Sequence, residues 1–243
     1  MPSRARILCA LVGAAVALAI ASPALADLPQ LGGPMKHILV WQVDTTLYAA
    51  LEGDPNEVLQ LQTYDTTYDP PADVLNGMAY NGQYGWLANG FFSLPAGAGV
   101  WVEVVAQSPE LSVYEQDTYV PIFGTDGAAT IWQWNGTMVH NWYATDTCGG
   151  FGATYSIYVG DSSGAPLAGY TPATIDLMWE YRPFVPGDLT GDGAVNLSDL
   201  GQMLPNYGVT SGASYEDGDI DGDGDVDLSD LGTLLSQYGV SCV

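Results

Sequence analysis

Oxygen-bearing side chains recur at every second position in two short stretches near the C-terminus of the chain. The first, starting at Gly187, reads GDLTGDGAVNLSDLGQMLPNYGV, and the second, starting at Gly218, reads GDIDGDGDVDLSDLGTLLSQYGV. They are offset by 31 residues and identical at 15 of 23 positions, which indicates one repeated unit. Alternating carboxylates and amides are suited to a hard cation, because Ca²⁺ takes about six to eight oxygen ligands at once.

Each stretch fits a twelve-residue calcium-binding loop. In such a loop, positions 1, 3, 5, 7, 9 and 12 supply oxygens, position 6 is Gly, and position 7 contributes its backbone carbonyl. Gly193 and Gly224 occupy position 6. The sequence therefore predicts two Ca²⁺ ions, one in each loop. The predicted ligands are Asp188, Thr190, Asp192, Ala194, Asn196 and Asp199 in the first loop, and Asp219, Asp221, Asp223, Asp225, Asp227 and Asp230 in the second.

The two loops differ in charge. The ligand positions hold three carboxylates in the first loop and six in the second, and Thr190 stands where the second loop has Asp221. Because ligand charge tunes calcium affinity, we expect the second loop to bind more tightly. Residues 187–243 contain eleven acidic residues and no Lys or Arg, so without metal this region should repel itself and unfold. Val195 and Val226, both at position 8, are predicted to pair with each other and join the loops.

The residues after each loop have helical spacing. No helical pattern precedes either loop, and Pro205 should kink or shorten the first helix. The alternative, a disordered acidic tail, is disfavoured because Gly, Val and Leu keep fixed places in both copies. The apolar residues at this spacing are Leu197, Leu200, Leu204 and Tyr207 in the first copy, and Leu228, Leu231, Leu235 and Tyr238 in the second.

A loop followed by a helix, present twice, with Asp at position 12 and no entering helix, resembles the type I dockerin domain. The resemblance covers residues 185–243 and rests on the duplicated EF-hand-type loops. It implies a calcium-folded module that binds cohesin modules on scaffoldin proteins. Such modules mount secreted proteins, often polysaccharide-degrading enzymes, on a larger assembly.

The resemblance also implies that loop positions 10 and 11 select the partner. These are Leu197 and Ser198 in one copy and Leu228 and Ser229 in the other. Since they are identical, the module could offer the same face after a half-turn. Leu at position 10 and the absence of basic residues from both helices depart from the family pattern. An exposed Leu pair could instead pack on another apolar surface, including the protein's own N-terminal domain.

The N-terminal residues 1–26 have the features of a signal peptide. Arg4 and Arg6 precede an apolar run over residues 7–20, and residues 24–26 read Ala-Leu-Ala. We therefore expect a secreted or cell-surface protein without membrane insertion. The net charge of −24 disfavours nucleic acid and anionic membranes as partners. Beyond the signal segment, Cys148 and Cys242 either form a disulfide or remain two free thiols.

Residues 27–181 are predicted to form an all-β sandwich of two antiparallel sheets. Residues 68–76 read as a loop or one helical turn, and residues 182–186, with two prolines, as a stiff linker to residues 187–243. Asn135-Gly136 between alternating stretches predicts a tight hairpin. The predicted strands cover residues 35–43, 46–51, 57–63, 100–106, 154–159 and 174–181.

The predicted β domain has few sequence features typical of a catalytic site. It contains no nucleophile, P-loop or dinucleotide-binding motif. His37 and His140 could pair on a metal or serve structure alone. Glu103 with Asp176 or Glu180 could supply the two carboxylates of a glycoside hydrolase, or all three could face solvent. Five tryptophans could either form a platform for sugar stacking or belong to the domain core. They are Trp86, Trp101, Trp132, Trp134 and Trp142.

Three functions fit these observations. We favour a secreted, non-catalytic protein whose dockerin-like module attaches a β domain to a cohesin-type partner or surface scaffold, because the calcium pattern is explicit and no catalytic pattern is. A carbohydrate-active enzyme, specifically a glycoside hydrolase in polysaccharide catabolism, docked by the same module, is the second. The third is a structural end cap stabilised by calcium, which binds no partner.

Overall fold

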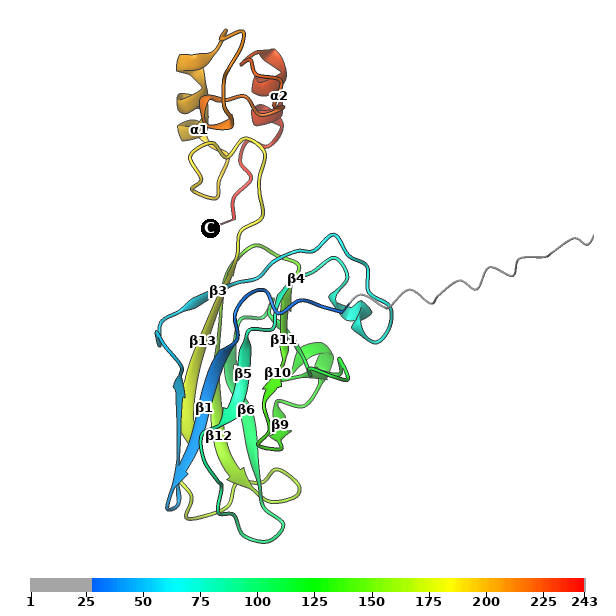
Figure 1. Ribbon diagram of the computed structural model, residues 1–243, viewed down its shortest axis with the longest axis vertical. Coiled ribbons are helices and arrows are strands. Elements are labelled where there is room, and N and C mark those ends of the chain that lie inside the picture. The colour runs from blue at the N-terminus through cyan, green and yellow to red at the C-terminus, as the bar shows by residue number, and fades with distance from the viewer. Residues whose placement is uncertain (1–27, 243) are drawn as a thin grey trace, which may run out of the picture.

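The computed structural model describes residues 28–242 (Figure 1). The predicted signal peptide, residues 1–26, lies outside this range. The described chain consists of a β-sheet domain followed by a shorter C-terminal segment that carries two helices. Among the described helices, none is long and apolar enough to cross a bilayer.

Thirteen strands lie within the described range, followed by the two α-helices. The strands are β1 (Lys36–Val43), β2 (Thr46–Leu51), β3 (Val58–Gln60), β4 (Ala79–Asn81), β5 (Tyr84–Ala88), β6 (Gly99–Gln107), β7 (Ser112–Tyr114), β8 (Pro121–Ile122), β9 (Ile131–Trp134), β10 (Val139–His140), β11 (Trp142–Thr145), β12 (Gly149–Gly160) and β13 (Ala173–Tyr181). The helices are α1 (Leu197–Met203) and α2 (Leu228–Ser236), with short 3₁₀ turns η1 (Ala72–Leu75), η2 (Thr125–Gly127), η3 (Leu204–Asn206) and η4 (Tyr215–Asp217).

The strands form three sheets, and we call this part of the molecule the three-sheet domain. Their orders are β10-β5-β1-β2, β4-β11-β7-β8 and β3-β13-β12-β6-β9. The prediction of an all-β domain is confirmed at this level, but its division into two antiparallel sheets is not: there are three, and both β1–β5 and β3–β13 pair in parallel. The largest hydrophobic core draws on all three sheets, and Ile38, Trp86, Tyr155 and Trp179 are fully buried in it.

The predicted hairpin at Asn135-Gly136 is wrong, and the chain forms only a bend there. The Asn135 side chain accepts hydrogen bonds from the Thr137 backbone N–H (2.8 Å) and hydroxyl (2.6 Å). The strands on either side do not pair with each other: β9 joins β6 and β10 joins β5, in different sheets. Trp134 at the end of β9 is 2% exposed in the largest hydrophobic core. The bend therefore carries the chain from one sheet to another.

Most strand predictions agree with the structure. The stretch 46–51 coincides with β2, and residues 100–106, 154–159 and 174–181 lie within or at β6, β12 and β13. Strand β3 is shorter than the predicted 57–63, because beyond Leu61 the chain turns away and Gln62 forms an isolated bridge with Tyr80. Of the two alternatives for residues 68–76, a loop or one helical turn, the structure shows a helical turn at residues 72–75.

The two helices pack around a small core of their own. Val195, Met203, Val226 and Leu234 are fully buried there, and Val185 joins them. Residues 182–184 therefore separate this core from β13. As Pro205 predicts, α1 ends at Met203 and continues only as the 3₁₀ turn η3.

Val195 and Val226 do not pair with each other as predicted. Val195 donates its N–H to the Val240 carbonyl (2.9 Å), and Val226 donates to the Val209 carbonyl (2.9 Å). Each loop is thus paired with the segment that follows the other copy's helix. The side chains of Val195 and Val226, at position 8 of their loops, are both fully buried in the shared core. The two repeats therefore interlock.

A disulfide joins the three-sheet domain to the end of the C-terminal segment. Cys148 and Cys242 are bonded, with Cα atoms 5.2 Å apart and a separation of 94 positions in sequence. Of the two alternatives left open by the sequence, the disulfide is the one observed. Disulfides persist in oxidising compartments, which is consistent with export.

Candidate metal centre

The first loop, residues 188–199, brings three carboxylates together. Oxygens of Asp188, Asp192 and Asp199, at positions 1, 5 and 12, all lie within 4.8 Å of one another. The loop is wound around Asp188, whose carboxylate accepts hydrogen bonds from the backbone N–H groups of Asp192 (3.2 Å) and Gly193 (3.0 Å). Gly193 adopts φ of 84°, a left-handed conformation that favours glycine and makes the sharp turn possible.

The carboxylate at position 12 is fully buried in each loop and accepts several hydrogen bonds. Asp199 is fully buried and accepts from the Thr190 N–H (2.9 Å), the Thr190 hydroxyl (2.9 Å) and the Asn196 N–H (2.8 Å). It occupies the third position of α1, where it completes a capping box with Asn196. The helix start and the loop therefore share one residue, so ordering the loop also orders the helix.

The second loop, residues 219–230, repeats this arrangement. Asp230 is fully buried and accepts backbone N–H groups of Ile220 (2.8 Å), Asp221 (3.2 Å) and Asp227 (2.8 Å). Asp227 caps α2 by a capping box with Asp230, as Asn196 caps α1. The same construction thus appears in both copies, 31 residues apart.

The second loop concentrates more charge than the first. Its carboxylates form two groups, one of Asp219, Asp221 and Asp223 and one of Asp225, Asp227 and Asp230, and within each group the oxygens lie within 4.8 Å of one another. The sequence assigned Asp225 a backbone role only, whereas the structure places its carboxylate in the second group. One Asp225 carboxylate oxygen is buried without a hydrogen-bond partner. The sequence feature that indicates a side-chain role for Asp225 is an acidic residue at position 7, where the first loop has Ala194.

Electrostatics distinguish these acids. Burial alone would raise the pKa of Asp199, but hydrogen bonds from Thr190 and Asn196 outweigh it, so its pKa lies below the ordinary value. The same balance, burial against hydrogen bonds from Asp227, Ile220 and Asp221, lowers the pKa of Asp230. Burial raises the pKa of Asp225, as do the neighbouring carboxylates. A cation in the loop would relieve this repulsion, so the donor set fits a hard divalent ion.

The remaining predicted ligands lie beside these carboxylates. Thr190 points its hydroxyl at Asp199, and the Asn196 amide lies 3.4 Å from both the Asp192 carboxylate and the Ala194 carbonyl. All the oxygen donors are of the hard kind that Ca²⁺ prefers. Which of these oxygens bind an ion stays a prediction.

Acidification should unfold the C-terminal segment. Asp199 and Asp230 have lowered pKa values in the folded state, so their contribution to stability is complete above the unfolded value of 3.8 and is lost as pH falls through the lower folded value. At saturating calcium we expect the segment to be equally stable between pH 7 and 5 and to lose stability only as the pH falls below 3.8. Amide hydrogen exchange against pH measures this. A segment still protected at pH 3, with unchanged calcium affinity, would contradict it.

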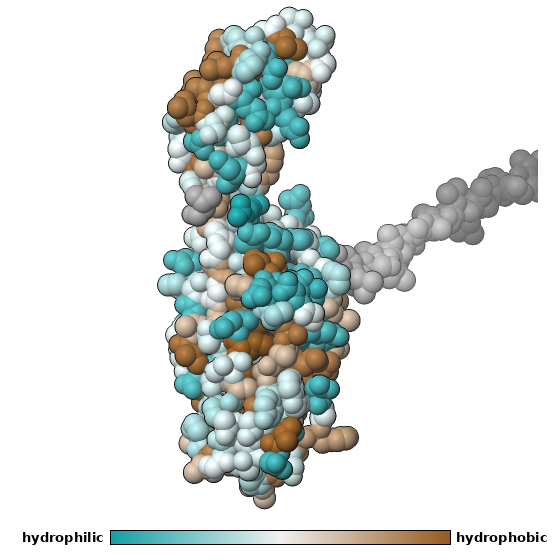
Figure 2. Space-filling view, turned by 90° about the vertical axis from the view of Figure 1, so that its left-hand side faces the viewer, coloured by the Kyte–Doolittle hydropathy of each residue, from teal (hydrophilic) through white to brown (hydrophobic). Residues whose placement is uncertain are grey.

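The predicted partner-selecting residues lie at the helix starts and are exposed. Leu197 is 69% exposed and Leu228 is 70% exposed, while Ser198 and Ser229 are also exposed. Neither leucine packs on the three-sheet domain, so that alternative is not what the structure shows. Each leucine belongs to a set of four exposed apolar side chains, and the two sets correspond residue by residue at an offset of 31. The sets are Leu197, Leu204, Tyr207 and Val209 in one copy, and Leu228, Leu235, Tyr238 and Val240 in the other. Apolar surface on the C-terminal segment is visible in Figure 2.

The tryptophans considered for a sugar platform lie mostly in the core. Trp86, Trp101, Trp134 and Trp142 are at most 9% exposed, and Trp132 is half-buried. An aromatic pair that the sequence did not single out is Trp41 on β1 stacked on Tyr48 of β2, with centroids 5.5 Å apart. The core interpretation is therefore the better one for the five predicted residues.

The two histidines lie close together but have other partners. Their ring centroids are 6.3 Å apart. His37 Nδ1 contacts Glu52 at 2.5 Å, and His140 Nδ1 lies 2.8 Å from the Gly82 carbonyl. Among residues 28–242, groups of three or more metal-binding side chains occur only in the two loops, so the histidine pair has no such group around it.

The three candidate catalytic carboxylates do not share a hollow. Glu103 lies on β6, whereas Asp176 and Glu180 lie on β13, on the far side of β12. Asp176 accepts a hydrogen bond from the Thr154 hydroxyl (2.6 Å), and Glu180 contacts Gln60 (2.5 Å) and Arg182 (3.0 Å). The two hollows that Asp176 lines contain neither glutamate.

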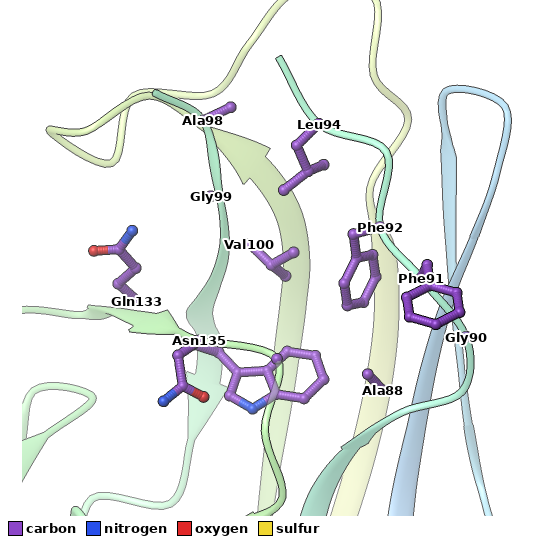
Figure 3. Close-up of a pocket in the computed structure, with 12 residues that line it drawn as sticks. Ala88, Gly90, Phe91, Phe92, Leu94, Ala98, Gly99, Val100, Gln133 and Asn135 are labelled. Carbon is purple, nitrogen blue, oxygen red and sulfur yellow. The ribbon is translucent and has the colours of Figure 1, made fainter. Parts of the chain in front are cut away.

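A different hollow, of about 430 Å³, lies where β5, β6 and β9 end (Figure 3). The twelve residues that line it include no ionisable side chain. Its polar groups include the amides of Gln133 and Asn135, and Phe92 packs edge-on against Trp134 at its base, with centroids 5.9 Å apart. Phe91 beside it is fully exposed. The hollow therefore suits an uncharged ligand.

Comparison of the chain with protein-family models finds no match, and comparison with curated proteins finds none either. What the described residues establish is a three-sheet domain, a disulfide, and a C-terminal segment with aspartate clusters that could hold metal ions.

Proposed function

We propose that residues 185–242 form a type I dockerin-like module that binds two Ca²⁺ ions and attaches the three-sheet domain to a cohesin-type partner or surface scaffold outside the cell. The observation that carries the proposal is the repeated loop construction, in which a buried position-12 carboxylate joins each acidic loop to its helix. No counter-charge is present within residues 187–243, which contain no Lys or Arg. Calcium would supply it.

The attachment surface is the pair of apolar sets at Leu197 and Leu228. Corresponding members have nearly equal exposure, for example 55% for Leu204 and 53% for Leu235. Two equivalent faces support binding in either of two orientations. Large side chains that stay exposed on an ordered helix lose the free energy that burial would provide, about 1.5–3 kcal/mol each, and a partner would recover it.

Binding to a panel of purified cohesin domains tests this proposal. With calcium, Leu197→Asp or Leu228→Asp alone should weaken binding by about twofold, because one face remains, while the double variant should lose about 2 kcal/mol or more, at least thirtyfold. Val105→Asp is the matched control, since Val105 is exposed on β6 in the other part of the molecule. Calcium binding without any partner would instead support the structural end cap.

A second function, binding of uncharged polysaccharide by the three-sheet domain, is favoured by the hollow at Phe91. The loop that displays Phe91 is pinned by Gln42, whose amide oxygen accepts from the Ser93 N–H (2.8 Å). An exposed ring at a hollow that also contains two amides can stack on a sugar face, while the amides bond its hydroxyl groups. The hollow offers no ionisable side chain to pair with a charged ligand, and the net charge of −24 repels anionic ligands.

Titration with neutral hexasaccharides of glucose, xylose and mannose tests the sugar site. Phe91→Ala should weaken binding of the best of them by about tenfold, the size expected for one aromatic contact. Phe184→Ala is the control, because Phe184 is also exposed but lies in the linker. Equal binding by both variants would move the site elsewhere. Turnover of the bound sugar would favour the glycoside hydrolase.

A further inference from the structure

The first loop is held from outside by the last residues of the chain. The Cys242 N–H donates to the Gly193 carbonyl (2.8 Å), the Gly239 N–H donates to the Val195 carbonyl (2.8 Å), and Val195 donates back to Val240. Ser241 forms an isolated bridge with Ala194, the position-7 residue whose carbonyl is a predicted ligand. Residues 239–242, which we call the tail strand, thus pair with the loop backbone at positions 6 to 8 and shape it.

The second loop is held in the corresponding way by an internal segment. Val226 exchanges hydrogen bonds with Gly208 (2.8 Å) and Val209 (2.9 Å), and the Ala213 N–H donates to the Gly224 carbonyl (3.0 Å). Residues 208–213 are covalently continuous with α1 and η3 on one side and with the second loop on the other. Chain connectivity alone keeps this segment beside its loop.

Residues 239–242 carry a covalent tie that residues 208–213 do not have, the disulfide at Cys242. Cys242 is only 7% exposed, and its bond to Cys148 ties the tail to the start of β12, where Gly149 pairs with Tyr181 of β13 in the largest sheet. The attachment point therefore lies directly before a strand of the largest sheet.

We propose that the Cys148–Cys242 disulfide positions the first calcium loop, by keeping residues 239–242 paired with residues 193–195, and thereby raises the calcium affinity of that loop and not of the second. The inference rests on the calcium-binding function proposed above. The disulfide thus supports the loop with fewer carboxylates, whereas the more acidic loop does not depend on it. Cys148 and Cys242 are positioning residues, since neither is among the predicted ligands.

Calcium titration of the full chain in four forms tests the inference. Asp223→Ala leaves only the first loop able to bind, and Asp192→Ala leaves only the second; each is combined with either the cysteine pair or the double change Cys148→Ser and Cys242→Ser. Loss of the disulfide should weaken the first loop by about tenfold, because an intramolecular tether acts as a high local concentration of the tail. It should change the second loop by less than about twofold.

Amide hydrogen exchange with both loops intact is the second measurement. In the double serine protein the Val195 amide should lose protection, whereas the Val226 amide should keep it. Equal losses at both loops would mean that the disulfide only stabilises the segment generally, and no loss at either would overturn the inference outright. If no form binds Ca²⁺, the proposed function fails, and protection at Val195 against Val226 still decides whether the disulfide positions the loop.

Discussion

Removing calcium with a chelator should unfold residues 187–242 while the three-sheet domain stays folded. The segment has eleven acidic residues and no Lys or Arg, and its buried core is small. A site saturated a hundredfold above its dissociation constant contributes about 2.7 kcal/mol to stability, so two sites contribute about 5 kcal/mol. That equals the whole stability of many small domains. Without the metal, repulsion among the clustered carboxylates remains and nothing offsets it.

The two parts of the molecule can be followed separately. All seven tryptophans lie between residues 41 and 179, so tryptophan fluorescence reports on the three-sheet domain alone. Amide exchange at Val195, Val226, Met203 and Leu234 reports on the C-terminal core. We expect full loss of protection there and unchanged fluorescence, both reversed by added Ca²⁺ and neither by equal ionic strength of NaCl. Protection that survives chelation would show that the segment folds without metal.

The two loops should bind calcium with different affinities. Asp223→Ala should abolish the tighter binding event and Asp192→Ala the weaker one, with at least a tenfold difference between the events that remain, because charge count tunes affinity over several decades. The physical reason is the clustering of carboxylates in the second loop, including Asp225, whose pKa is raised by burial and by its acidic neighbours. A divalent ion that relieves this repulsion binds with a larger gain.

Isothermal titration of the two variants measures the difference. Asp176→Ala, which removes an acid from the surface of β13, is the control for a change in net charge alone. Equal affinities in the two variants would contradict the prediction, and so would a tighter site that survives Asp223→Ala. The second result would mean that the fit of the first loop outweighs charge, for example through the support of the tail strand.

Several features of this protein could be predicted from short stretches of sequence. The duplicated oxygen pattern located both acidic loops, and Pro205 located the end of α1. Alternating apolar residues located β1, β2, β6, β12 and β13. These predictions succeeded because each depends on contacts within about a dozen residues, where spacing alone decides which side chains meet.

Pairing between distant segments could not be predicted in this way. The chain bends at Asn135-Gly136, yet the flanking strands enter different sheets, and Trp134 between them is buried in the core. Val195 and Val226 find partners in Val240 and Val209 rather than in each other. Local pattern specifies that a strand forms, but competition among all available edges decides which one it joins.

The sequence by itself determined that this protein carries two acidic loops, each followed by a helix, behind a β-rich domain. Only the tertiary structure decided that Cys148 meets Cys242, that Asp225 turns its carboxylate into a cluster, and that Leu197 and Leu228 stay exposed although their spacing matches a core face. The reason is that burial and pairing depend on which surfaces the whole chain brings together. Spacing along one helix does not contain that information.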